Sequence, residues 1–154
     1  MILVHTLAGI VALIAGAVNL LRTKGTPRHR WIGRVYAGAM YLLIGTSFFI
    51  YELFGSFGAF HVLAIVSGVT LTLGLYFPLR RRRYPGWLEH HYFWMGFAYV
   101  GLVMATGSHF FAYLPEWPWL LRALLFWGLP YLIGVFLLYR QRRRVLARFA
   151  PDTL

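Results

Sequence analysis

The chain has 154 residues and a formal net charge of +11, and 60% of its residues are hydrophobic. A mean hydropathy of +0.64 with only four acidic residues excludes an ordinary soluble domain and indicates a membrane protein. The chain contains no cysteine, which excludes thiolate metal sites, iron–sulfur clusters and disulfides, so any bound metal has nitrogen or oxygen ligands.

Five apolar segments are each long enough to cross about 30 Å of hydrocarbon as a helix that rises about 1.5 Å per residue. In chain order they span residues 3–21, 35–54, 59–79, 92–114 and 120–139. The fifth contains Pro130 and almost no polar side chain, which predicts a kinked helix outside a four-helix core or against a partner subunit. We therefore expect an all-α integral membrane protein with a core over 1–115, a fifth transmembrane helix over 116–140 and a basic cytoplasmic tail over 141–154.

The basic residues are confined to alternate connections. All of the 15 Lys and Arg except Arg122 lie in the first loop, the third loop or the C-terminal tail. With five spans and the N-terminus outside, these charges share one side, which the positive-inside rule assigns to the cytoplasm. We expect an N-out, C-in protein whose basic residues attract anionic lipid headgroups, at about 1 kcal/mol per residue. Nucleic-acid binding is not expected, because such a patch should also form a shaped soluble surface.

The first four segments form two similar pairs. The stretch "HTLAGIVALIAGAVNLLR" resembles "HVLAIVSGVTLTLGLYFPLR", and "HRWIGRVYAGAMYLLIGTSFF" resembles "HHYFWMGFAYVGLVMATGSHF". This indicates a duplicated helix pair that forms an up-down four-helix bundle. The two repeats span about residues 5–54 and 61–114. The duplication makes His5 equivalent to His61 near the outer surface, and His29 equivalent to His90 near the inner surface.

Two of these histidines lie on stripes of small or polar residues. The stripe of the first segment is His5, Gly9, Ala12, Gly16 and Asn19, and that of the third is His61, Ala64, Gly68 and Thr72. Small residues let membrane helices approach closely, so both histidines are expected to face the bundle interior. Ionisable side chains at membrane depth are functional candidates. Two facing imidazoles suit axial ligation of haem b, although hydrogen bonds across the bundle with no cofactor would also explain them.

A divalent metal ion is the alternative cofactor for the outer histidines. By depth, His109 near the outer end of the fourth segment joins His5 and His61, and Glu52 lies at the same edge. Nitrogen and carboxylate oxygen ligands of this kind suit several divalent metals. The sequence therefore gives two ligand sets for one location, a haem pair and a metal group of His5, His61, His109 and Glu52.

The inner histidines have a second, structural interpretation. Thr26 is predicted as a helix N-cap with Pro27 at the first helical position, so "TPRHR" is also a well-formed helix start at headgroup level. A histidine at such a start can simply be solvated. The pair His29 and His90 is therefore either a second haem site or part of two solvated helix starts.

Several stretches are similar to one known family. They are His5, "KGTPRHRWIGRVY" at 24–36, "SFFI" at 47–50, "FHVLAIVSGVTL" at 60–71, and His90. The chain resembles a family of small bacterial membrane proteins known as domain of unknown function 2306. The resemblance covers about residues 1–115, and neither His109 nor the fifth segment is part of the family pattern. It implies a multi-pass protein of the bacterial cytoplasmic membrane with these histidines as site residues, and it implies no activity.

Three classes of function remain open. A redox protein would hold haem between paired histidines and pass electrons across the membrane or to a quinone, which explains the pairing, the two levels and the small-residue stripes together. A small transporter would use the parallel repeats. An accessory or assembly subunit would dock a partner complex through the fifth segment. The sequence contains no nucleophile with a base and an acid and no phosphate-binding loop, so catalytic residues are left unassigned.

Overall fold

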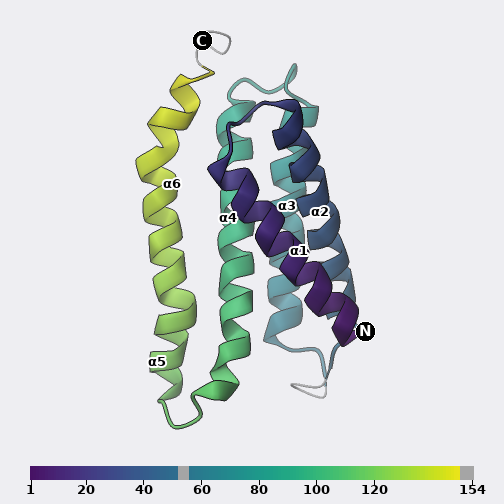
Figure 1. Cartoon of the computed structure of the whole chain (residues 1–154), viewed down its shortest axis with the longest axis vertical. Coiled ribbons are helices and arrows are strands. Elements are labelled where there is room, and N and C mark those ends of the chain that lie inside the picture. Colours follow the sequence, from purple (N-terminus) through teal and green to yellow (C-terminus); the bar gives the residue numbers. More distant parts are fainter. Residues whose placement is uncertain (52–55, 150–154) are drawn as a thin grey trace. The chain divides into compact units, whose positions relative to one another are not determined.

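The computed structural model describes residues 1–51 and 56–149, and every regular element among them is helical. In chain order the elements are α1 (Ile2–Leu21), α2 (Pro27–Ser47), α3 (Ala59–Leu79), α4 (Trp87–Ser108), the 3₁₀ helix η1 (His109–Tyr113), α5 (Trp119–Ala123), the π-helix η2 (Leu124–Gly128) and α6 (Leu129–Ala147) (Figure 1). Because α5, η2 and α6 follow one another without a break, the described residues form five long helical segments. It divides into two compact units inside α3, unit 1 being Met1–Val69 and unit 2 being Thr70–Leu154.

Local capping fixes the connection between α1 and α2. The side chain of Thr26 accepts a hydrogen bond from the backbone N–H of His29 at 3.1 Å, and Pro27 opens α2, as the sequence predicts. The Lys24 ammonium donates to the carbonyls of Asn19 and Leu20, both at 2.6 Å, and so caps the negative end of α1. Partial burial lowers the pKa of Lys24 from its ordinary value.

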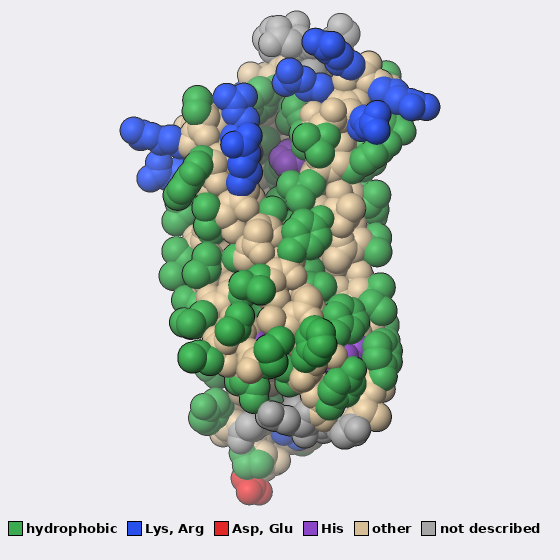
Figure 2. Space-filling model, turned by 90° about the vertical axis from the view of Figure 1, so that its right-hand side faces the viewer, with side chains coloured by type: hydrophobic (Ala, Val, Ile, Leu, Met, Phe, Trp, Pro, Cys, Tyr) green, Lys and Arg blue, Asp and Glu red, His purple; other side chains and the backbone are tan. Residues whose placement is uncertain are grey.

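Unit 1 packs α1 against α2 through small residues. The buried residues of α1 are Ala8, Ala12, Ala15 and Gly16, while most of its large aliphatic side chains are exposed. This agrees with the expected inward stripe, on which His5, Gly9 and Asn19 are half-buried. Small side chains let the two helices approach, and the large ones are left to face lipid. Hydrophobic side chains cover most of the face shown in Figure 2.

The buried face of α3 departs from the expected stripe. His61 and Ala64 are buried as predicted, but Thr72 is exposed and Leu71 is fully buried instead. The reason is that the second half of α3 packs against α4 through Gly74, whose position leaves no room for a side chain beside Met95. In the second half of α3, the buried residues are therefore those that face α4.

Unit 2 packs α4 against the last helical segment through three glycines. A methyl group added at Gly96 would collide with Leu138, one added at Gly134 would collide with Val100, and one added at Gly107 would lie 2.8 Å from a backbone oxygen. That oxygen belongs to Phe126 in η2. Close approach at small residues is the usual way in which membrane helices associate. The predicted fifth helix therefore lies along α4.

Several helix boundaries differ from those expected from hydropathy. The helices α2 and α4 begin at Pro27 and Trp87, before the expected residues 35 and 92. The second helix ends at Ser47 and not at residue 54, and the fourth ends at Ser108 before a 3₁₀ turn. The last helix continues beyond residue 139 to Ala147, because its basic residues are good helix formers. The disruption expected at Pro130 takes the form of the π turn η2, which relieves the clash between the proline ring and the carbonyl four residues earlier.

Three helical segments are long and apolar enough to cross a membrane by length and composition, within the part of the chain that the structure describes. They are Ile2–Leu21, Phe60–Leu79 and Trp119–Ala147. The helices α2 and α4 begin with charged and histidine residues, which lower their mean hydropathy. The structure thus gives three to five candidate spans, with five remaining the sequence expectation.

Candidate functional site

The imidazole of His5 is held by the last turn of α2. His5 lies in the first turn of α1, and its Nδ1 is 3.1 Å from the side-chain oxygen of Thr46. The Thr46 hydroxyl directs its single proton toward the carbonyls of Leu42, at 2.8 Å, and Leu43, at 3.0 Å. Its oxygen is therefore the acceptor and His5 Nδ1–H is the donor. This contact fixes the tautomer of neutral His5, with the lone pair on Nε2.

The imidazole of His61 is enclosed by aromatic rings in the first turn of α3. Only 3% of the residue is exposed. Its ring stacks on those of Tyr51 and Phe57 at centroid distances of 5.0 and 4.9 Å, and the Phe48 ring lies at 6.1 Å. The Gly58 N–H donates to His61 Nδ1 at 3.1 Å. His61 Nε2 is buried without a hydrogen-bond partner in the described part of the chain, which makes it a candidate ligand-binding atom.

Both imidazoles contact the same end of α2. Thr46 holds His5, and Phe48, two residues further on, contacts His61. Two helices of the same direction, α1 and α3, therefore bring their first-turn histidines to one end of unit 1. The partners named above are a hydroxyl for His5, and a backbone amide and aromatic rings for His61.

The two histidines differ in how well they fit an iron ligand. An imidazole that binds a metal through Nε2 usually donates Nδ1–H to a second group, which fixes the tautomer. His5 has this arrangement, with Thr46 as the acceptor. His61 does not, because its Nδ1 accepts from Gly58 and the proton of the neutral ring is then on Nε2. Ligation by His61 therefore requires that its contact with Gly58 be exchanged for another.

The predicted metal group is not assembled among the residues that can be described. Within residues 1–51 and 56–149, no group of three or more His, Asp or Glu side chains is placed to hold a metal ion. His109 is exposed at the start of η1, in unit 2, whereas His5 and His61 belong to unit 1. Glu52 lies outside the described residues. The metal group therefore stays a prediction.

The inner histidines lie in the first turns of α2 and α4. His29 contributes its backbone N–H to the N-cap of α2. His90 is exposed, donates Nδ1–H to the carbonyl of Gly86 at 3.0 Å, and packs its ring 4.6 Å from that of Phe77. Because His29 belongs to unit 1 and His90 to unit 2, their pairing stays a prediction.

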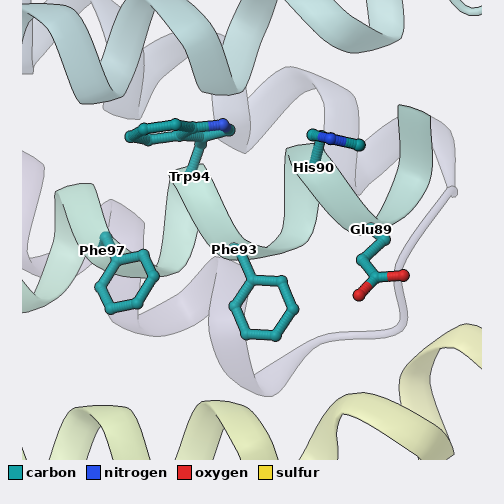
Figure 3. Close-up of a pocket in the computed structure, with 5 residues that line it drawn as sticks. All are labelled: Glu89, His90, Phe93, Trp94 and Phe97. Atoms are coloured by element: carbon teal, nitrogen blue, oxygen red, sulfur yellow. The ribbon is translucent and has the colours of Figure 1, made fainter. Parts of the chain in front are cut away.

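Sequence reasoning missed a groove on α4. It has a volume of about 300 Å³ and is lined by Glu89, His90, Phe93, Trp94 and Phe97. Figure 3 shows His90 and Trp94 on one side and Glu89, Phe93 and Phe97 on the other. The spacings of four residues, 89/93/97 and 90/94, are the signal that would have predicted it, because such residues share a helix face. The Glu89 carboxylate forms an ion pair of 2.6 Å with Arg142 of α6.

These features define a multi-pass helical membrane protein. The chain belongs to the family described as "Predicted membrane protein (DUF2306)", which it matches over residues 2–139. The match extends through the fifth helical segment, which corrects the expectation that the resemblance ends at about residue 115. Comparisons with curated proteins and with solved structures gave no match.

Proposed function

We propose that this protein binds haem b, with His5 and His61 as axial ligands, and transfers electrons within or across the membrane. The observation that carries the proposal is that imidazoles from α1 and α3 both contact the C-terminal end of α2, at Thr46 and at its C-cap Phe48. One is held in the tautomer of a metal ligand, and the other has a buried ring nitrogen without a partner in the described chain. In the described state this nitrogen carries the ring proton, so iron ligation requires the proton to move to Nδ1.

The surrounding residues have defined parts in this proposal. Bound haem would supply a one-electron iron couple. Thr46 holds His5 in the tautomer with Nδ1–H, and the rings of Tyr51 and Phe57 limit the rotation of His61. The Gly58 amide is the group that must release His61 Nδ1, so the segment before α3 has to adjust when the cofactor binds. An aromatic enclosure also excludes water, which raises the strength of polar interactions inside it.

The proposal includes the arrangement expected from the sequence. Each of the helices α1 to α4 carries one of the paired histidines in its first turn. In an up-down bundle made of a duplicated helix pair, this puts His5 and His61 at one membrane surface, and His29 and His90 at the other. The basic loops favour N-out, C-in insertion in a bacterial cytoplasmic membrane with anionic lipids at the inner face.

The other two classes of function have weaker support. The paired histidines lie in first turns, near helix ends, whereas a transporter typically has its polar groups near the bilayer midplane. Exposed apolar side chains on α6 do not favour an accessory subunit either, because contact with lipid accounts for them.

The test is an absorption spectrum of the full chain purified in nanodiscs from cells supplied with haem precursor. We expect a Soret band and sharp visible bands on dithionite reduction. His5→Ala and His61→Ala should each remove or shift these bands, whereas His109→Ala should keep them, because His109 is exposed and serves only in the metal alternative. A colourless protein, or spectra that both ligand variants leave unchanged, would overturn the proposal.

A further inference from the structure

The groove on α4 has an apolar length and a polar end. Phe93 and Phe97 follow Glu89 at intervals of four residues, so the groove extends along about 12 Å of helix at about 1.5 Å per residue. Trp94, with His90, forms the other side of the groove (Figure 3). Glu89 and His90, in the first turn of α4, provide the polar groups. A groove of this size and lining suits a small amphiphile with a flat ring.

The polar end offers hydrogen-bond acceptors. His90 already donates Nδ1–H to Gly86, so Nε2 of the neutral ring carries a lone pair and accepts. Glu89 is a carboxylate and also accepts, and its charge is balanced by Arg142 at 2.6 Å. The complementary head group is therefore uncharged and carries hydroxyl donors. A lipid phosphate is a poor match, because it would meet the Glu89 carboxylate and an arginine that is already paired.

We propose that this groove binds the head of a membrane quinol, with a ring hydroxyl donating to His90 Nε2. The aromatic ring lies against Trp94 and Phe93, and the apolar tail continues past Phe97 toward the hydrocarbon. The proposal concerns binding alone and does not depend on haem at His5 and His61, because the groove residues and Arg142 belong to unit 2 and the haem ligands to unit 1.

The test measures binding of a short-chain ubiquinol to the full chain in nanodiscs, by anaerobic equilibrium dialysis. We expect saturable binding by the wild type. His90→Ala should raise the dissociation constant at least about tenfold, which corresponds to the loss of one good hydrogen bond. His90→Gln keeps an acceptor and should retain most of the affinity. The matched control is His109→Ala, an exposed histidine beyond the other end of α4, which should bind as the wild type does.

Two further measurements separate the alternatives. The oxidised quinone has no hydroxyl donor and should bind at least about fivefold more weakly than the quinol, and Phe97→Ala should weaken both forms equally. Phe97→Ala also serves if His90→Ala fails to fold. Absence of saturable binding, equal affinity of His90→Ala, or displacement of the quinol by phosphatidylglycerol would overturn the proposal. Loss of a haem band in His90→Ala with quinol affinity unchanged would also overturn it, because His90 would then be an iron ligand.

Discussion

Thr46 is the residue whose replacement tests the geometry around His5 most cleanly. Thr46→Val removes the oxygen that lies 3.1 Å from His5 Nδ1 and keeps a side chain of similar shape at a buried position. Hydrogen bonds between membrane helices are worth about 0.6 kcal/mol on average and about 1.7 kcal/mol at most. Because the variant leaves an imidazole N–H without this acceptor, we expect the upper half of that range, a loss of about 1–1.7 kcal/mol in the free energy of unfolding.

The matched control for this prediction is Thr106→Val on α4. The Thr106 hydroxyl donates to the Leu102 carbonyl at 2.8 Å, the same distance as from Thr46 to Leu42, and it contacts no histidine in the described chain. We expect its unfolding free energy to change by less than about 0.5 kcal/mol. The assay is unfolding in mixed micelles of dodecyl maltoside and sodium dodecyl sulfate, followed by circular dichroism. Equal losses in the two variants would refute the reasoning.

Three other predictions concern packing, charge and orientation. Gly107→Ala should lower the free energy of unfolding by about 1–3 kcal/mol, because the added methyl group would lie 2.8 Å from the backbone oxygen of Phe126. Gly45→Ala is the control and should not destabilise the protein, because nothing lies within 4 Å of its added methyl group. Equal effects of the two variants in mixed-micelle unfolding would contradict the glycine packing. Glu89→Gln should change the free energy of unfolding by less than about 1 kcal/mol in the same assay, since Glu89 and its ion-pair partner Arg142 are both about 40% exposed. A larger loss would show that this ion pair is coupled to other groups. A C-terminal green fluorescent protein fusion should be bright and a C-terminal alkaline phosphatase fusion inactive, and the reverse pattern would invert the proposed orientation.

Local signals in the sequence predicted the helical segments and one of their caps. The apolar runs gave five helical segments because hydropathy depends on the residues of each segment alone. The N-cap at Thr26 followed from a short motif with Pro27, and the structure has the corresponding hydrogen bond to His29. The inward stripe of α1 was also predictable, because small and large residues alternate with the helical period.

Features that depend on packing between helices were not predictable. Nothing in the local sequence indicates that α2 ends at Ser47, since residues 48–50 are as compatible with a buried helix as their neighbours. The same holds for Thr72, which is exposed although its neighbours in the sequence do not predict it. The enclosure of His61 by Tyr51 and Phe57 depends on the path of the connection before α3. The choice of Gly58 as a donor to His61 Nδ1, which decides the tautomer, is likewise a property of the folded chain.

The haem content of the purified chain tests the central claim most directly. A pyridine haemochrome assay on the full chain in nanodiscs, with protein quantified by amino-acid analysis, gives the number of haem groups per chain. The account predicts at least about one haem b per chain in the wild type and about one fewer in His61→Ala. A wild-type chain that folds, remains helical and carries no haem under these conditions would contradict it.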